Sequence, residues 1–463
     1  MLKLYNTLTR KIELLKSLKG KEIRIYNCGP TVYDYAHIGN LRTFTLQDLL
    51  RRYIEFKGFS VKQVMNITDV DDKTIKASRE QGTSLSEFTQ KFFQEFAKDA
   101  KALGIKEPTK TVFATKEIPE MIKIVVRLLA KKIAYKSDDN SVYFDIKKFK
   151  GYGKLSKLKL AKLKAGARVS HDSYEKNEAR DFVLWKAWQE TDGEVFWDAP
   201  FGRGRPGWHL ECSAMSLKYL GGKIDIHGGG VDLVFPHHEN EIAQSESFTG
   251  KPVVSHWFHS NHLIVNGKKM SKSLGNFYTL HDLKDNSPRA LRLLFFSAHY
   301  RDELNFTIDS LKQAENNIAG FDEFVRRLQA LDGKGDSIAA KKLVEKSRAD
   351  FEKNLDNDLD TPKMLAGLHA FIRQANKLVD GKKIGKKEAE NILRLLKEMN
   401  SVLGVFVFEF DTVVSKEILS LIEEREKARA EKNYKRSDEI RALLLEKGIQ
   451  LNDTPDGVKW KKI

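Results

Sequence analysis

Two cysteines, a histidine and a glutamate have the side chains to bind a metal ion together. Cys28 and Cys212 are the two cysteines of the 463 residues, and His237 and Glu241, four residues apart, would share one face of a helix. Two thiolates, an imidazole and a carboxylate make a tetrahedral zinc set. No CxxC spacing supports it, and a lone cysteine is commonly a small core residue, so both interpretations stay open on these residues alone.

Two further segments have side chains suited to a triphosphate. His37-Ile38-Gly39-Asn40 stands at the predicted start of a helix, where an imidazole and backbone amides suit phosphate charge and Gly39 permits close approach of an adenine ring. Lys269-Met270-Ser271-Lys272-Ser273 offers ammonium groups and hydroxyls that can hold a leaving pyrophosphate. Taken singly, the first segment is more typical of an ordinary turn, and the second is a moderate signal.

The elements that must position these side chains favour an α/β fold. Residues 22–27 are rich in β-forming residues and run into Cys28-Gly29-Pro30, after which residues 43–56 have a helical pattern. Strand, glycine-rich turn and helix open a nucleotide-binding unit. Residues 61–67 predict a second strand, which ends at the acidic cluster 68–72, where α/β sheets place their ligands.

An insertion divides the predicted sheet. The pattern is less regular over residues 109–206, and residues 146–168 hold nine basic residues and no acidic one. Lysine-rich surfaces are common, so we interpret that stretch as a solvated face, with an RNA contact as the alternative. Residues 223–227, followed by three glycines, then predict another strand, and a helix is expected from about His237.

Strand signals become sparse after residue 288. Apolar residues at spacings of three and four give one helix face and indicate a helical bundle: Leu311, Ala314, Ile318, Phe321, Val325 and Leu328. Residues 418–463 read as a charged helical stretch that ends in a strand-like unit at Val458-Lys459-Trp460.

The fold class is therefore α/β, a Rossmann-type parallel-sheet catalytic domain with an insertion, followed by an all-α bundle and a small C-terminal domain. The expected bounds are 1–108 and 207–288 for the two catalytic halves, 109–206 for the connective insertion, 289–414 for linker helices and bundle, and 415–463 for the C-terminal domain.

The composition indicates the kind of partner and the cellular compartment. The formal net charge is +16, from 80 Lys and Arg against 64 Asp and Glu, which favours a polyanionic partner. Two distant cysteines indicate a reducing compartment. No stretch reaches the ~20 apolar residues of a membrane span, so we expect a cytoplasmic location and no membrane partner.

Taken together, in this order and on either side of an insertion, the two phosphate-suited segments resemble the HIGH and KMSKS signatures of class I aminoacyl-tRNA synthetases. Asn40 stands where the class signature has a second histidine, and its amide can still donate a hydrogen bond. Further segments look like landmarks of the cysteinyl-tRNA synthetase family: YNCGPTVYD, NITDVDDK, DFVLWK, GRPGWHLECSAM, DIHGGGVDLVFPHHENEIAQSE and KMSKSLGNF.

The resemblance implies roles for individual residues. Zinc would be bound by Cys28, Cys212, His237 and Glu241, and the cysteine pocket would be lined by Gly29, Thr68, Trp208 and Asp232. ATP would contact His37, Gly39, Gly228, Gly229, Gly230 and Lys272, with His37, Asn40, Lys269 and Lys272 as the catalytic positions. The C-terminal part would read the anticodon, with Arg425, Arg429, Asp438 and Asp453 as candidate base contacts.

The same resemblance implies the activity and the partners. The chain would use ATP, with Mg²⁺, to activate cysteine and transfer it to the 2′-hydroxyl of the terminal adenosine of tRNA-Cys, with one zinc ion per chain. Apart from the resemblance, we expect a monomer rather than an oligomer. Two alternatives are the cysteine ligase of mycothiol synthesis and a non-catalytic, zinc-containing RNA-binding protein. A complete C-terminal region argues against the first alternative, and an intact pyrophosphate loop argues against the second.

Overall fold

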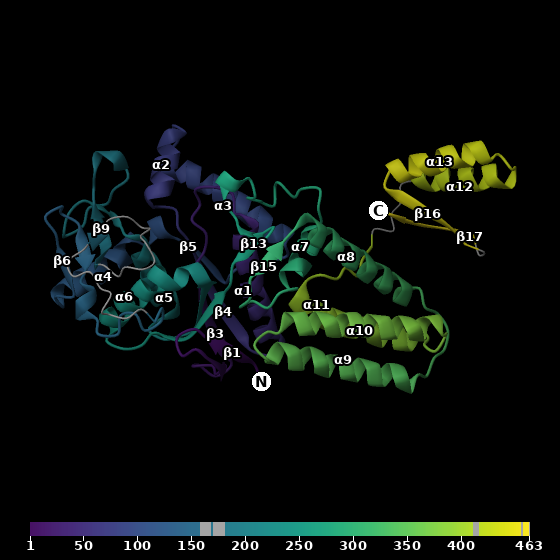
Figure 1. The fold of residues 1–463 in the computed structure, drawn as a ribbon, viewed down its shortest axis with the longest axis horizontal. Helices are drawn as coiled ribbons and strands as arrows, with labels where there is room; N and C mark the ends of the chain where they lie inside the picture. The colour runs from purple at the N-terminus through teal and green to yellow at the C-terminus, as the bar shows by residue number, and fades with distance from the viewer. Residues whose placement is uncertain (158–167, 170–180, 411–415, 455–456, 463) are drawn as a thin grey trace. The chain divides into compact units, whose positions relative to one another are not determined.

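The structure is a computed structural model that describes residues 1–157, 168–169, 181–410, 416–454 and 457–462. The chain divides into two compact units, Met1–Phe406 and Val407–Ile463. Figure 1 shows the elements of both units. Among the described residues, no helix combines the length and the apolar character that crossing a bilayer requires.

A five-stranded parallel sheet forms the centre of the first unit. Its strand order is β12-β11-β3-β4-β5, with bounds Val254–Ser260, Ile224–Gly230, Glu22–Asn27, Ser60–Ile67 and Lys110–Phe113. The strands have mainly buried side chains, as expected for a parallel sheet covered on both faces. Strands β4 and β5, which follow β3 in the chain, lie on one side of it, and the later strands β11 and β12 lie on its other side. The sheet therefore has a switch point between β3 and β11, where α/β folds bind ligands.

Helices cover this sheet, and one begins earlier than its apolar pattern predicts. The first unit has α1 (Ile38–Phe56), α2 (Asp72–Glu80), α3 (Leu85–Ala102), α4 (Ile118–Ala130), α5 (Trp208–Leu220), α6 (Glu239–Thr249) and α7 (Pro288–Phe295) around its sheets. Helix α1 starts at Ile38 rather than at residue 43, because the His37 side chain caps it by accepting a hydrogen bond from the Asn40 amide. The predicted α/β fold class is confirmed.

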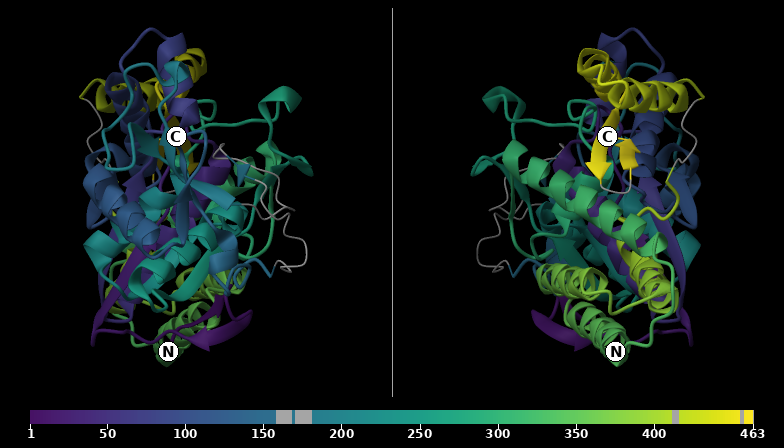
Figure 2. Two further views of the ribbon diagram at one scale, coloured as in Figure 1. Left: turned by 90° about the vertical axis from the view of Figure 1, so that its left-hand side faces the viewer. Right: turned by 90° about the vertical axis from the view of Figure 1, so that its right-hand side faces the viewer.

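The insertion forms a sheet of its own. Its strands β6 (Ala134–Lys136), β7 (Val142–Phe144), β9 (Asp181–Ala187) and β10 (Gly204–Pro206) pair antiparallel, and β8 (Arg168–Val169) pairs with β9. The left-hand view of Figure 2 faces the insertion. Strand β5 pairs with β4, so the central sheet continues past residue 109. Residues 158–167 of the lysine-rich stretch lie outside the described residues.

Two smaller sheets flank the carboxyl edge of the central one. Strands β1 (Lys3–Asn6) and β2 (Lys11–Leu14) form a hairpin, and the Thr7 amide donates to the Trp257 carbonyl of β12. Strands β13 (Leu263–Val265), β14 (Lys268–Lys269) and β15 (Leu304–Phe306) form the other sheet, in the order β14-β13-β15. The segment Lys269–Ser273 therefore leaves a short hairpin just after the sheet's last strand.

Four helices complete the first unit: α8 (Ile308–Gln329), α9 (Ile338–Asp356), α10 (Thr361–Asp380) and α11 (Lys386–Leu403). Every residue of the predicted apolar face of α8 is buried, which confirms the helical bundle. Arg292 of α7 joins the bundle to the catalytic part. Its guanidinium lies 2.6 Å from Asp48 of α1 and 2.6 Å from the Leu403 carbonyl of α11.

The second unit is small. Helices α12 (Lys416–Ala430) and α13 (Tyr434–Glu446) precede a hairpin of β16 (Ile449–Thr454) and β17 (Gly457–Lys462). Its core consists of Ile422, Ile440, Leu444, Ile449 and Leu451. The charged helical stretch with a terminal strand-like unit is thus present as the sequence predicts.

Candidate active site and metal centre

The four predicted metal ligands meet at the carboxyl edge of the central sheet. Cys28 directly follows β3, Cys212 lies in α5, and His237 and Glu241 lie in the helical turn Val234–His238 and in α6. All four are buried, and their ligating atoms lie within 4.8 Å of one another. The two sulfurs are 3.7 Å apart, and His237 Nε2 is 3.0 Å from Glu241 Oε1.

This arrangement fits a tetrahedral zinc ion. Two sulfurs each ~2.3 Å from zinc at a tetrahedral angle lie about 3.8 Å from each other. The observed sulfur separation of 3.7 Å agrees with that value. Behind His237, the ring of His209 approaches with its Nδ1 2.9 Å from the His237 Nδ1. Such an outer contact orients a ligating imidazole.

The charges of the cluster also fit a cation. Burial raises the pKa of Cys212, but a hydrogen bond from Cys28 and the charge of His237 lower it to about 6. Burial likewise raises the pKa of Glu241, whereas His227 and His237 lower it to about 2. Burial lowers the pKa of His237, and the anions of Cys212 and Glu241 raise it to about 10. A buried thiolate and carboxylate thus attract one positive charge to this point.

Two histidines outside the predicted ligand set lie against the same cluster. His227 and His238 form a second set of potential ligands with Cys28 and Glu241. His238 directs its Nδ1 to His259 Nε2 at 2.7 Å, and the His227 ring stacks on Trp257 at 4.5 Å. The set with two thiolates suits zinc better, because zinc is a borderline-soft ion. For His238, the available sequence signal was the adjacent pair of histidines after Pro236.

The predicted cysteine pocket borders the metal cluster. The half-buried Trp208 ring stacks on His237, with the ring centres 4.2 Å apart. The Gly29 amide donates to Asn66 Oδ1 at 2.9 Å, and Asn66 Nδ2 donates to Thr68 Oγ1 at 3.1 Å. A Cβ at Gly29 would lie 1.7 Å from the Asn66 carbonyl oxygen, so only glycine fits there. Gly29, Thr68 and Trp208 are therefore brought together.

Glu211, which was not among the predicted site residues, completes this network. The Thr68 hydroxyl donates to Glu211 Oε2 at 2.8 Å, and both side chains are buried. Burial and the neighbouring Cys212 raise the pKa of Glu211 well above its usual range. Its position directly before Cys212 in the chain was a signal, but the partner lies 143 residues away.

Asp232 lies on a different side of the site. It is exposed and follows β11, within the turn Val231–Leu233. Burial lowers the pKa of His37, and the charge of Asp232 opposes that effect. Asp232 is therefore close enough to His37 to act on it electrostatically.

The HIGH-like and KMSKS-like segments touch. A Cβ at Gly39 would lie 3.0 Å from His37 Nδ1 and 3.3 Å from Met270 Cε. The Ile38 amide donates to the Tyr278 carbonyl at 2.9 Å. Because His37 Nδ1 accepts from the Asn40 amide at 3.1 Å, Nε2 carries the proton of the neutral ring and can donate to a phosphate. The exposed Asn40 side chain lies in the first turn of α1.

Asn276 closes the KMSKS-like loop. It accepts from the Ser271 amide at 2.8 Å and donates to the Lys269 carbonyl at 3.1 Å. The Lys269 side chain is exposed, and Lys272 begins the short helical turn Lys272–Leu274. The Lys272 side chain is outside what the structure describes.

Three glycines end β11 beside β3. A Cβ would lie 2.8 Å from Asn27 Nδ2 at Gly228, 2.9 Å from His238 Cε1 at Gly229, and 2.4 Å from Asp232 Oδ1 at Gly230. A side chain at any of these positions would displace a neighbouring side chain. They line the switch point between the ATP-suited segments and the metal cluster.

The acidic cluster after β4 serves the fold in this structure. Asp69 accepts from Thr115, and Asp71 caps α2 through the Thr74 amide. Asp72 accepts from Lys186 at 2.7 Å and from Arg205. These carboxylates thus tie α2 to the insertion and to the end of β5, and they are committed to protein partners.

The four C-terminal candidates lie in the second unit. Arg425 is buried and forms a double hydrogen bond with Asp453, at 2.6 and 2.9 Å. Arg429 is 2.6 Å from the same carboxylate, and Asp438 is exposed on α13. Three of the four candidates are therefore grouped, with Asp453 at their centre.

A switch-point sheet with the two signature segments in contact at its carboxyl edge defines a class I aminoacyl-tRNA synthetase. Residues 14–316 match the family described as tRNA synthetases class I (C) catalytic domain, and residues 350–407 match the DALR domain. The crystal structure of Mycobacterium tuberculosis methionyl-tRNA synthetase bound by methionyl-adenylate has the same fold. Its TM-score is 0.62 at 12% identity, and the match covers 83% of this chain and 92% of that one.

Full-length relatives specify the family. The cysteine--tRNA ligase of Brachyspira hyodysenteriae (strain ATCC 49526 / WA1) is 47% identical over 99% of this chain and 98% of its own. That of Protochlamydia amoebophila (strain UWE25) is 45% identical over 100% of this chain and 98% of its own. The chain belongs to the cysteine--tRNA ligase family, which confirms the resemblance seen in the sequence.

Proposed function

We propose that the chain joins cysteine to tRNA-Cys in two steps at the carboxyl edge of the central sheet. The cysteine carboxylate first attacks the α-phosphorus of ATP, which gives cysteinyl-adenylate and releases pyrophosphate. The 2′-hydroxyl of the terminal tRNA adenosine then takes the cysteinyl group and releases AMP. The observation that carries the proposal is the contact between Gly39 and Met270 beside a buried Cys/His/Glu cluster.

Positioning and charge account for the first step. The positive end of α1 and the Nε2 proton of His37 face the space in which we place the ATP phosphates. We assign Lys269 and Lys272 to the departing pyrophosphate, and the glycines that end β11 leave room for the nucleotide. Magnesium would accompany ATP. No side chain becomes covalently attached, so catalysis depends on alignment and preorganised charge.

The amino-acid pocket recognises the ammonium group of cysteine. The Thr68 hydroxyl donates its proton to Glu211 and accepts from Asn66, which leaves an oxygen lone pair as an acceptor for an ammonium group. Gly29 and Trp208 form the adjoining walls. Asp232 offers a carboxylate on the side of His37 and would contact the ammonium or the adenylate ribose.

We assign Cys28, Cys212, His237 and Glu241 as zinc ligands. When bound there, zinc would take the substrate thiolate as a ligand and so favour sulfur over the oxygen of serine. His209 orients His237, and Trp208 shields it from solvent by stacking. The sulfur separation and the buried negative charge support this assignment.

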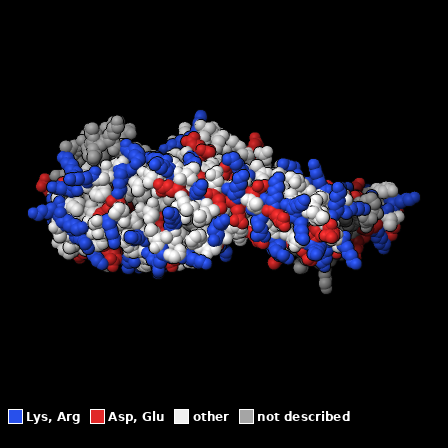
Figure 3. Space-filling view, turned by 90° about the horizontal axis from the view of Figure 1, so that it is seen from below, with Lys and Arg blue, Asp and Glu red and all other residues white. Residues whose placement is uncertain are grey.

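The C-terminal region would provide the contacts to tRNA. The net charge of +16 favours a polyanion, and Figure 3 shows Lys and Arg distributed widely over one face among acidic residues. Within the second unit, Asp453 fixes Arg425 and Arg429, and we propose that this group and Asp438 contact exposed anticodon bases. We also propose that the chain acts as a cytoplasmic monomer, which its molar mass in solution would test.

Two assays test the proposal. Pyrophosphate exchange should depend on added cysteine, and an unfractionated tRNA pool should accept labelled cysteine into one isoacceptor group. Exchange with no tRNA charging would favour a small-molecule acceptor, as in the cysteine ligase alternative. Absence of both activities in folded, zinc-loaded protein would contradict the assignment.

A further inference from the structure

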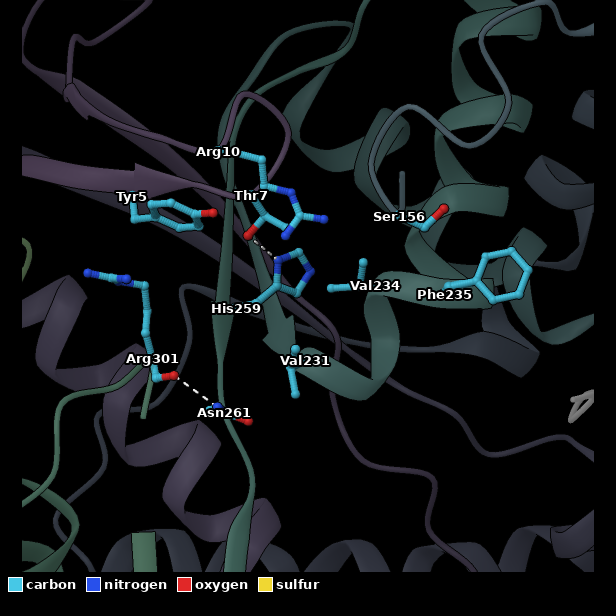
Figure 4. A pocket seen from close by; sticks show the side chains of 10 residues that line it. All are labelled: Tyr5, Thr7, Arg10, Ser156, Val231, Val234, Phe235, His259, Asn261 and Arg301. Atoms are coloured by element: carbon cyan, nitrogen blue, oxygen red, sulfur yellow. Dashed lines mark hydrogen bonds between the residues drawn. The ribbon is translucent and has the colours of Figure 1, made fainter. Parts of the chain in front are cut away.

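A cavity outside the metal centre opens beside the ends of β11 and β12 (Figure 4). Its volume is about 450 Å³, which falls in the range of small-molecule sites. Its walls come from β1 and the turn after it, from Ser156 of the insertion, from the end of β12, from residues that follow β11 and β12, and from Arg301. Neither the metal ligands nor the assigned ATP residues line it.

Arg10 supplies a positive charge to this cavity. Figure 4 shows its guanidinium directed toward the cavity centre. One of its nitrogens donates to the Leu155 carbonyl at 3.0 Å, and no carboxylate of the described residues pairs with it. A guanidinium held by a carbonyl but lacking an anion is suited to a phosphate.

The turn that carries Arg10 is anchored to β12 through Asn6. Asn6 is buried and bonds to the Ser255 carbonyl and the Trp257 amide of β12, at 3.0 and 3.1 Å. Arg10 itself has φ +62°, a left-handed conformation that is uncommon for an arginine. A charged side chain held in a costly backbone conformation beside a cavity suggests a functional role for it.

Tyr5 and two valines give the cavity an aromatic and apolar side. The Tyr5 hydroxyl points toward Thr7 and the cavity in Figure 4. Its ring is braced by the Arg301 guanidinium, 4.8 Å from the ring centre, and Asp358 holds that guanidinium at 2.8 Å. Val231 is partly exposed at the opposite wall, beside Val234. An apolar wall with an aromatic hydroxyl at its edge accommodates a base and its sugar.

The position of the cavity identifies its ligand. Val231 directly follows Gly230 and precedes Asp232, so the cavity borders the place where we expect the adenylate. The strand that delivers the terminal adenosine must pass next to that place. We propose that the cavity binds a nucleotide just before the terminal adenosine of tRNA, with Arg10 on its phosphate and Tyr5 on its sugar or base. This inference rests on the proposed function.

Charge favours a phosphodiester over free ATP in this cavity. A phosphodiester carries one negative charge, which matches the single guanidinium of Arg10 that lacks a carboxylate partner in the described region. A triphosphate carries about four and would need several cations or a metal ion. We therefore place ATP at His37 and the tRNA strand here.

The test compares two RNAs on the same variants. Binding of uncharged tRNA-Cys is measured beside binding of the same tRNA lacking its three 3′ nucleotides. Arg10→Ala should weaken binding of intact tRNA about 5- to 10-fold and lower its salt slope by about one. Both proteins should bind the shortened tRNA equally. Tyr5→Phe keeps the ring against Arg301 and should give a smaller loss that is again confined to intact tRNA.

Matched variants and a second assay make the outcome decisive. Arg10→Lys should retain part of the affinity, and Lys11→Ala, which removes the next cation outside the cavity, should bind both RNAs as the original chain does. Equal loss for intact and shortened tRNA would overturn the inference. So would an ATP KM that rises in parallel during pyrophosphate exchange, which would assign the cavity to free nucleotide. Binding of tRNA can be measured without charging. If the proposed function were wrong, the protein with the original sequence would bind tRNA but would not charge it, which is a different outcome from those above.

Discussion

The Thr68 hydroxyl donates to Glu211 Oε2 over 2.8 Å, although 143 residues separate them. Glu211→Gln replaces the acceptor by an amide that can donate, so the hydroxyl can turn its proton toward the substrate ammonium. We expect the KM for cysteine in pyrophosphate exchange to rise about tenfold, which corresponds to ~1.4 kcal/mol, with a smaller change in kcat. Zinc content should stay the same. A parallel loss of zinc would mean that Glu211 acts on the metal centre instead.

Metal removal should abolish cysteine activation. The purified chain is expected to hold about one zinc ion, with Zn–S distances near ~2.3 Å by X-ray absorption. Cys212→Ser and His237→Ala should each lower zinc content and pyrophosphate exchange together. Ser213→Ala, on the same helix but outside the ligand set, should retain the metal. Fully active protein without any metal would rule out the assignment.

Asp99 should make stability depend on pH. Burial, with the charge of Glu95, raises its pKa from 3.8 to about 6, against the opposing charge of His281. A raised pKa in the folded state contributes stability below about pH 4, and this contribution is lost as the pH rises through about 6. Asp99→Asn should therefore exceed the original chain in free energy of unfolding at pH 7.5 by about 1 kcal/mol, after allowance for solvent screening. The two should be equal near pH 4.

The measurement is urea unfolding of both proteins at the two pH values. Asp138→Asn, which removes a carboxylate from an exposed turn, provides the matched control. Its free energy of unfolding relative to the original chain should not change between the two pH values. An Asp99→Asn advantage that is the same at both pH values would point to a packing effect rather than to ionisation.

Removing the second unit should separate the two reaction steps. Met1–Phe406 forms a compact unit that contains every residue that we assign to adenylate formation. A chain ending at residue 414 should keep cysteine-dependent pyrophosphate exchange within about twofold, and lose charging of tRNA by about 10² or more, because each lost base contact contributes ~1–3 kcal/mol. Charging at the full rate by the shortened chain would refute anticodon reading by this unit.

Serine should be rejected at activation. Serine and cysteine differ by one atom, and a pocket that distinguishes them by shape alone reaches only ~10². With zinc ligation of the thiolate, the ratio of kcat/KM for cysteine over serine should exceed that value in pyrophosphate exchange. Preformed seryl-tRNA should not be hydrolysed faster with the enzyme than without it. Ready activation of serine would argue against direct recognition of the thiolate.

The sequence predicted the site best where chemistry and local spacing coincide. His237 and Glu241 are one helical turn apart, and the glycine and lysine signatures are contiguous, so each could be recognised without knowing the fold. Glu211 was not found because its role depends on Thr68 from a distant strand end. The carboxylates after β4 could not be recognised as structural for the same reason. The partners of Asp72, Lys186 and Arg205, come from the insertion, and Asp69 accepts from Thr115 after β5.

The start of α1 shows a limit of a different kind. Apolar periodicity locates the buried face of a helix, whereas a cap depends on the backbone conformation of a single residue. His37 has φ −82° and ψ 162°, an extended conformation from which its ring reaches the Asn40 amide. The same residue was selected for its chemistry, and capping was not foreseen from its type, because serine, threonine, aspartate and asparagine are the usual caps.

The strand order has a consequence for how the chain folds as it is made. Strand β11 lies between β3 and β12, yet it follows β3 by almost two hundred residues, with the insertion between them. While the ribosome adds that insertion, the backbone amides and carbonyls along one edge of β3 remain unpaired. An unpaired strand edge is prone to association with other chains. Cys28, at the end of the same strand, remains without its proposed co-ligands during this time. Newly made chains should therefore depend on protection of this edge until residues 224–230 emerge and fill the gap.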